Sequence, residues 1–133
     1  MSPALTLATI TLLVPDYDEA LAFYVGSLGF DLVEDTDLQG GKRWVVVSPG
    51  AKGTRLLLAK ATDAAQKAAI GHQAGGRVAF FLETDNFDAA HARFVAAGVS
   101  FLESPRAEPY GTVAVFSDPF GNRWDLIEPK APA

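Results

Sequence analysis

Hydrophobic and polar positions follow two different periods at the start of the chain. Residues 5–14 alternate in the two-residue pattern of a β-strand. In residues 17–28 the apolar side chains recur at three- and four-residue intervals, as on one face of a helix. Asp16, just before this run, and Glu19, in its first turn, have the arrangement of a capping box, and Gly29 stands where a left-handed C-cap would. The pattern therefore predicts a strand followed by a helix near residues 17–28.

Three further strands are predicted in the first half of the chain. They are rich in β-branched and large apolar side chains, which favour strands, and they cover residues 30–35, 43–48 and 54–61. Residues 62–76 combine helix-forming Ala, Gln and Lys with a Gly-rich end. We expect this segment to be a connection with room for a short helix.

The same order of elements then begins again. A strand over 77–84 and a helix near 86–97 precede strands over 100–104, 112–117 and 123–128. Asp16 and Asp85 occupy matching places, 69 positions apart, at the starts of the two predicted helices. The same offset relates Ala20 to Ala89, Gly29 to Gly98 and Glu34 to Glu103.

This internal repeat predicts an α+β fold built from two βαβββ modules, because repeats take precedence over local signals in assigning a fold. We expect a first module over residues 1–62, a connection over 63–75 and a second module over 76–133, packed as one compact domain. A segment over 106–112, which contains Pro and Gly, is expected to be a loop with Tyr110 at its tip.

Composition narrows the possible functions. The 133 residues are 49% hydrophobic, which is ample for one folded domain. The net charge of −5 without a Lys/Arg cluster argues against nucleic-acid binding. No apolar run approaches the length of a membrane span, and no basic segment precedes the apolar start. There is no Cys. We therefore expect a cytoplasmic protein with neither nucleic acid nor membrane as a partner.

Two longer stretches resemble a known family. LLVPDYDEALAFYVGSLGF and DPFGNRWDLIEP are similar to the opening strand and helix, and to the closing turn and strand, of the vicinal oxygen chelate superfamily. This group includes glyoxalase I, extradiol dioxygenases, fosfomycin-resistance enzymes and bleomycin-resistance proteins. The resemblance implies mixed sheets curled around a cavity, helices on the convex side, and a homodimer. In the metalloenzymes of the group, four strands hold one divalent metal such as Zn, Ni, Mn or Fe.

The metal positions implied by the resemblance are mostly occupied by residues that are not metal ligands. The first falls on Thr9, and the strand expected to supply the second, residues 54–61, contains no carboxylate. The third falls on Ala79, or on Val78 if the register shifts by one. Only Asp125, at the fourth, has a suitable side chain. We therefore expect no metal and no other cofactor, and we expect the two histidines, His72 and His91, to be ordinary surface residues.

A cavity can be outlined around Asp125. If Asp125 faces inward, alternation turns Arg123 the same way, and the resemblance brings in residues of the first and fifth strands. The candidate ligand-binding residues are Thr9, Thr11, Trp44, Arg77, Phe81, Glu83, Tyr110, Arg123 and Asp125. Two interpretations of the charged members remain open. Arg123 and Arg77 can pair with Asp125 and Glu83 for structural reasons, or these groups can bind a ligand.

Three functions are compatible with these patterns. The favoured hypothesis is a glyoxalase/bleomycin-resistance-like protein that binds a small organic molecule without a complete metal site. The alternative is a lyase, isomerase or dioxygenase of the same superfamily, either with a metal or with acid–base chemistry by Glu83 and Asp125. The third is a dimerisation module with a closed core, in which no room is left for a ligand.

Overall fold

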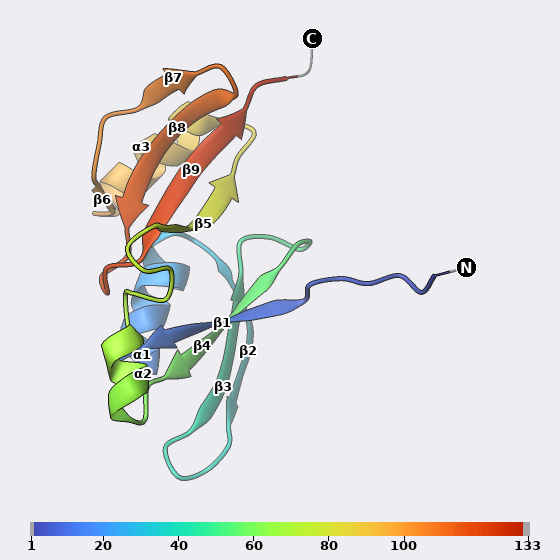
Figure 1. The fold of residues 1–133 in the computed structure, drawn as a ribbon, viewed down its shortest axis with the longest axis vertical. Coiled ribbons are helices and arrows are strands. Elements are labelled where there is room, and N and C mark those ends of the chain that lie inside the picture. The colour runs from blue at the N-terminus through green and yellow to red at the C-terminus, as the bar shows by residue number, and fades with distance from the viewer. Residues whose placement is uncertain (1, 132–133) are drawn as a thin grey trace. The chain divides into compact units, whose positions relative to one another are not determined.

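The computed structural model describes residues 2–131 and divides the chain into two compact units, residues 1–67 and 68–133 (Figure 1). Each unit contains a mixed β-sheet and at least one helix. The predicted α+β class is therefore confirmed.

The first unit has the order strand, helix, strand, strand, strand. Its sheet runs β1-β4-β3-β2, with β1 parallel to β4 and the other neighbours antiparallel. The first helix continues as a π-helical segment, which agrees with the helix predicted near residues 17–28. The elements are β1 (Thr9–Val14), α1 (Tyr17–Leu21), η1 (Ala22–Ser27), β2 (Asp31–Asp37), β3 (Arg43–Ser48) and β4 (Arg55–Lys60).

A short helix, α2 (Ala64–Ala69), follows the first sheet, within the segment expected to be a connection. The sheet of the second unit then runs β5-β9-β8-β6, and β5 is parallel to β9. A short additional strand, β7, pairs with β8. The elements are β5 (Val78–Glu83), α3 (Phe87–Ala96), β6 (Ser100–Phe101), β7 (Arg106–Glu108), β8 (Gly111–Ser117) and β9 (Arg123–Pro129).

The internal repeat is present in the structure. The two sheets have the same strand order, and β1 and β5 begin and end at the predicted offset. Both helices end at a glycine with positive φ, 75° at Gly29 and 85° at Gly98, as a left-handed C-cap requires. The helix starts differ: Asp16 caps α1 by accepting from the backbone N–H of Glu19, whereas α3 is capped by Asn86 and not by Asp85.

Two boundaries differ from the prediction. The first strand begins at Thr9 and not at residue 5, because its partner β4 begins opposite it at Arg55. Leu5 and Leu7 before it are 90% and 66% exposed, and this segment extends away from its sheet (Figure 1). The segment 106–112 is not a loop throughout: Arg106–Glu108 forms β7, which turns at Tyr110 into β8.

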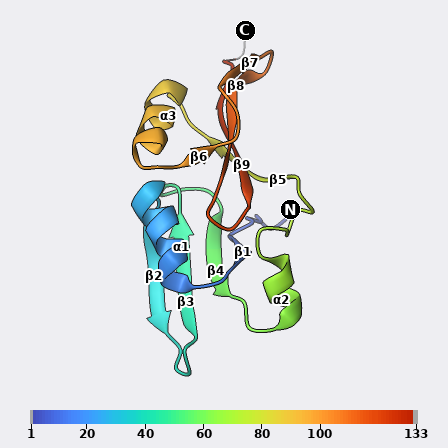
Figure 2. The same cartoon turned by 90° about the vertical axis from the view of Figure 1, so that its left-hand side faces the viewer.

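Each unit buries one face of its sheet beneath its own helix (Figure 2). In the first unit, the fully buried side chains include Leu12, Tyr24, Val45, Val47 and Leu58. In the second unit, Phe94 of α3 packs edge-on against Phe116 of β8, which stacks on Trp124 of β9. Burying each such side chain contributes about 1.5–3 kcal/mol. The opposite face of each sheet is not covered by the helix of its own unit, and it is this open face that can present a site.

Candidate functional site

Asp125 lies on the open face of the second sheet. In the strand pairing it stands opposite Phe81 of β5 on one side and Val115 of β8 on the other. Because side chains alternate along a strand, its neighbours Trp124 and Leu126 point to the α3 side. The prediction that Asp125 faces away from the helix-covered core therefore agrees with the register.

The carboxylate of Asp125 is buried without a partner. The residue is only 7% exposed, and its Oδ1 is the one buried side-chain oxygen or nitrogen in residues 2–131 that has no hydrogen bond. Burial raises the pKa of Asp125, the positive charge of Arg106 lowers it, and the negative charge of Glu103 raises it. A buried acceptor without a donor is costly. This position is therefore the strongest candidate for a ligand contact on the sheet.

Arg106 is held beside Asp125 by two other carboxylates. Its Nε donates to Glu103 at 2.9 Å and its Nη1 donates to Glu108 at 2.6 Å. Arg106 stands opposite Val113 in the β7–β8 pairing, which places it on the same face as Asp125. Among residues 2–131, Arg106 forms its ion pairs with these two glutamates and none with Asp125.

Glu103 anchors this group of charges to the sheet. Its Oε2 accepts a hydrogen bond of 2.9 Å from the backbone N–H of Val115. The bond from Arg106 lowers the pKa of Glu103, burial opposes this, and the Val115 bond lowers it further. The hydrogen bonds to Glu103 and Glu108 raise the pKa of Arg106, with a smaller contribution from Tyr110. Sequence reasoning missed Arg106 and Glu108 because it treated residues 106–112 as a loop without a defined face, and it noted Glu103 only as a member of the internal repeat.

The other predicted residues of the second unit fall into three places. Phe81 and Glu83 share the face of Asp125, and Phe81 is 68% exposed. Arg123 lies on the same face by alternation and is exposed. Tyr110 is 54% exposed at the turn between β7 and β8. Arg77 lies before the first residue of β5 and is exposed.

The structural pairing that was one of two interpretations of the two arginines is not found. Within the described part of the chain, neither Arg77 nor Arg123 forms an ion pair with Asp125 or Glu83. Simple alternation from Phe81 and Glu83 does not extend back to Ala79. An irregularity between Val78 and Phe80 inserts one extra residue, so that Val78 and not Ala79 stands opposite Arg123.

In the first unit, Thr11 and Trp44 line a cavity of about 610 Å³. Trp44 is 41% exposed, and Thr9, which is exposed, lies two residues before Thr11 on the same strand. The charged residues around this cavity are Lys42, Arg43 and Lys60. Arg43 is engaged by Asp35 and Asp18, at 2.8 and 2.9 Å.

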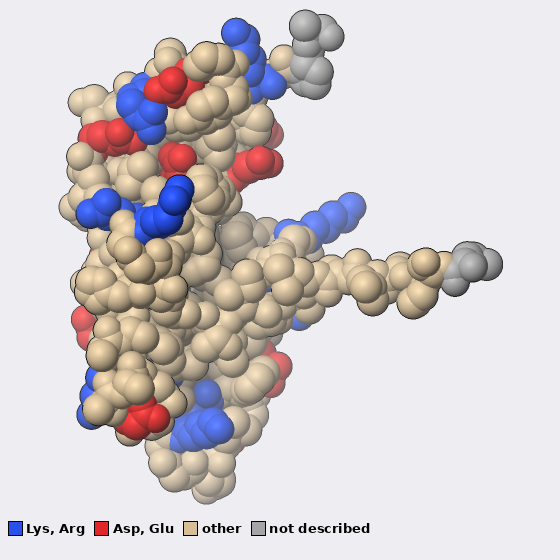
Figure 3. Space-filling view, in the orientation of Figure 1, with Lys and Arg blue, Asp and Glu red and all other residues tan. Residues whose placement is uncertain are grey.

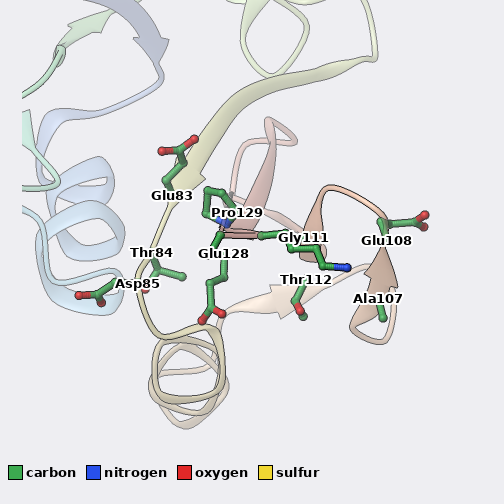
Figure 4. A pocket seen from close by; sticks show the side chains of 11 residues that line it. Glu83, Thr84, Asp85, Ala107, Glu108, Gly111, Thr112, Glu128 and Pro129 are labelled. Carbon is green, nitrogen blue, oxygen red and sulfur yellow. The ribbon is translucent and has the colours of Figure 1, made fainter. Parts of the chain in front are cut away.

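A second cavity, of about 860 Å³, lies at the end of the second sheet (Figure 4). Four carboxylates line it, but in Figure 4 those of Glu83, Asp85 and Glu128 point in different directions. One oxygen of Glu128 is already engaged by the backbone N–H of Phe87 at 2.7 Å. The acidic side chains of this cavity therefore do not converge on one point.

The residues present do not fit a resident divalent metal. At the positions implied by the family resemblance, Thr9, Val78 and Ala79 offer no ligand suited to a transition metal beside Asp125. Among residues 2–131 no three His, Cys, Asp or Glu side chains come together as a metal-binding group. His72 is exposed as predicted, whereas His91 is half-buried and packs against Phe87 and Phe101, with ring centroids 5.5 and 4.3 Å away.

On the face drawn in Figure 3, acidic and basic side chains are scattered, and neither charge is concentrated in one place. No helix in the described residues has the length and apolar character needed to cross a membrane.

Comparison with known proteins assigns the fold to a family. The sequence model described as the glyoxalase/bleomycin resistance protein/dioxygenase superfamily matches residues 6–126. The chain belongs to this superfamily. The resemblance seen in the sequence is thereby confirmed, and the chain is a glyoxalase/bleomycin-resistance-like protein.

Similar proteins match this chain over nearly its whole length. An uncharacterized protein of Shewanella frigidimarina (strain NCIMB 400) is 51% identical over 125 residues, covering 92% of this chain and 93% of the relative. The crystal structure of UcmS2 matches with a TM-score of 0.81 at 30% identity, covering 95% of this chain and 99% of UcmS2. TnmS3, an antibiotic binding protein from Streptomyces sp. CB03234, matches with a TM-score of 0.76 at 32% identity, covering 98% and 99%.

Proposed function

We propose that this protein binds a small organic molecule on the open face of its second sheet and needs no resident metal to do so. The observation behind this proposal is Phe81, a phenyl ring in the middle of β5 that is 68% exposed. Phe81 shares this face with Ile127, its diagonal neighbour on β9, and with Val115 on β8, one strand further along the sheet; both are half-buried. An apolar surface with a few polar groups is typical of small-molecule sites.

The relatives support the same function. TnmS3 is described as an antibiotic binding protein and shares 32% identity over almost the whole chain. The family also takes part of its name from bleomycin resistance. A lyase, isomerase or dioxygenase with a metal would need at least two further ligands beside Asp125, and among residues 2–131 no three His, Cys, Asp or Glu side chains come together.

Binding can be tested with two antibiotics, doxorubicin and bleomycin, by calorimetry in the presence of EDTA. We expect at least one to bind stoichiometrically, and Phe81→Ala to weaken that binding without lowering the midpoint of thermal unfolding. Val95→Ala is a matched control, because Val95 is an exposed apolar residue on α3, on the other side of the sheet. Binding that appears only after addition of Zn, Ni, Mn or Fe, or chemical conversion of the bound compound, would favour the enzyme hypothesis instead.

We further propose that the protein is a cytoplasmic homodimer. Exposed apolar side chains support an interface between two copies, since Leu5, Leu7 and Ile10 are 90%, 66% and 38% exposed around the start of β1. Light scattering during gel filtration is expected to give twice the monomer mass of 14.1 kDa. A monomer mass at all concentrations would refute the dimer and leave the binding proposal intact.

A further inference from the structure

We infer that the ligand is a flat aromatic molecule with a positively charged or N–H donor group, and that Asp125 holds this group. The inference rests on the proposed function and adds the chemistry of the ligand to it. Three observations support it: the missing partner of Asp125, the balance of charges around it, and the exposed ring beside it.

The missing partner sets the chemistry of the contact. The side chain of Asp125 is 7% exposed and its Oδ1 receives no hydrogen bond. The residues opposite it in the two neighbouring strands, Phe81 and Val115, have apolar side chains and cannot donate. An ionised carboxylate only accepts hydrogen bonds. The group that completes this position must therefore be a donor.

The charges on the open face favour a cation as that donor. Arg106 is the positive group that acts on Asp125, and Glu103 and Glu108 already bind it. With Asp125 itself included, four carboxylates and two guanidinium groups lie on and beside this face. Glu83 of β5, Arg106 and Glu108 of β7 and Arg123 of β9 share the face of Asp125 by register. Glu103, from the segment before β7, joins them through its contacts with Arg106 and Val115.

The exposed ring of Phe81 favours a flat aromatic body for the ligand. Phe81 stands directly opposite Asp125 in the parallel pairing of β5 and β9, and neighbouring strands lie about 5 Å apart. Aromatic rings attract one another in offset stacks. A planar ligand stacked on Phe81 can thus place a donor on its rim within reach of Asp125. This arrangement covers the exposed ring and satisfies the buried oxygen at the same time.

Three acridines of similar shape separate the effect of charge from that of stacking. 9-Aminoacridine is a planar cation with N–H donors, acridine is neutral at pH 8, and acridine-9-carboxylate is an anion. We expect fluorescence titration of the full-length protein at pH 8 to show about tenfold tighter binding of 9-aminoacridine than of acridine. The carboxylate is expected to bind more weakly than either.

Amino-acid substitutions test whether Asp125 is responsible for the preference for the cationic probe. Asp125→Asn keeps the shape of the side chain and removes its charge, so we expect about tenfold weaker binding of 9-aminoacridine and unchanged binding of acridine. Asp88→Asn makes the same change in net charge on α3, behind the sheet, and is expected to bind all probes like the wild type. Phe81→Ala is expected to weaken the binding of 9-aminoacridine and the binding of acridine by the same factor.

The possible failures are distinguishable. If Asp125→Asn and Asp88→Asn weaken the binding of 9-aminoacridine equally, the net charge of the protein alone attracts the probe. The role of Asp125 is then refuted. If the wild type binds the three acridines equally, the ligand class is wrong while small-molecule binding stands. If none of the acridines binds, the inference is overturned. The antibiotic titrations under "Proposed function" then decide independently whether small-molecule binding survives.

Discussion

Asn122 donates its side-chain amide to Oδ2 of Asp118 at 2.7 Å, and its backbone N–H donates to Oδ1 of the same carboxylate at 2.8 Å. Oδ1 also accepts from the backbone N–H of Phe120 at 2.9 Å. Both Asp118 and Asn122 are buried, with 4% and 3% exposure. The carboxylate of Asp118 thus fixes the turn that leads into β9, the strand that carries Asp125.

Removing this carboxylate is expected to destabilise the protein. Asp118→Ala leaves two backbone N–H groups and one amide without an acceptor, so we expect a loss of about 2–4 kcal/mol in the free energy of unfolding. Urea denaturation checks this value. Asp63→Ala removes another carboxylate that accepts from a backbone N–H, but an exposed one, and is expected to cost about 1 kcal/mol or less. Equal losses in the two variants would contradict the role of Asp118.

Asp125→Asn is expected to stabilise the ligand-free protein at pH 7 by about 1–2 kcal/mol, because it replaces an unpaired buried charge with a neutral group. The pKa of Asp125 is raised in the folded state, so the folded protein binds its proton more tightly than the unfolded chain. The charge therefore lowers stability progressively as the pH rises from about 3.8 through the raised pKa.

Thermal unfolding from pH 3 to pH 8 tests this dependence. The wild type and Asp125→Asn are expected to differ little below pH 3.8 and increasingly above it, with a constant difference beyond the raised pKa. A variant that is less stable than the wild type at pH 7 would show that Asp125 has a structural partner.

Gly71 is expected to tolerate no side chain. Its φ is +75°, and a Cβ at this position would meet the backbone carbonyl of Phe120. Gly75 has a similar φ of +65° but open space around it. Gly75→Ala is therefore expected to cost about 1 kcal/mol from backbone strain, and Gly71→Ala at least about 2 kcal/mol more. Chemical denaturation of the two variants compares them directly, and equal costs would contradict the close approach.

Arg43 is expected to resist replacement by lysine. Its guanidinium donates two hydrogen bonds to Asp35, at 3.1 and 2.8 Å, and lies 5.1 Å from the ring centroid of Tyr17. A lysine keeps the charge but cannot reproduce the planar two-point contact. Arg43→Lys should therefore lower the midpoint of thermal unfolding, whereas Arg55→Lys, at an exposed position, should not. An unchanged midpoint for both would show that the contact contributes nothing measurable.

The sequence predicted the fold well because its signals were local and occurred twice. The glycines that end both helices and the matched strands needed no long-range information. The open face was harder to predict, since Arg106 reaches it only through the pairing of β7 with β8, and three residues are too few for a recognisable period. The partners of Asp125 could not be predicted either, because whether Arg123 or Arg77 reaches it depends on side-chain direction and not on spacing.

The extra residue between Val78 and Phe80 also bears on how the proposed ligand-binding face of this protein can change. Because side chains alternate, a one-residue slip in a strand normally exchanges its two faces. Here the irregularity confines such a slip to the first part of β5, so Phe81 and Glu83 keep their positions. A single insertion or deletion at this point could therefore replace one group presented to a bound molecule while the hydrophobic core stays intact. Selection could in this way alter what the protein recognises in small steps, without first redesigning the fold.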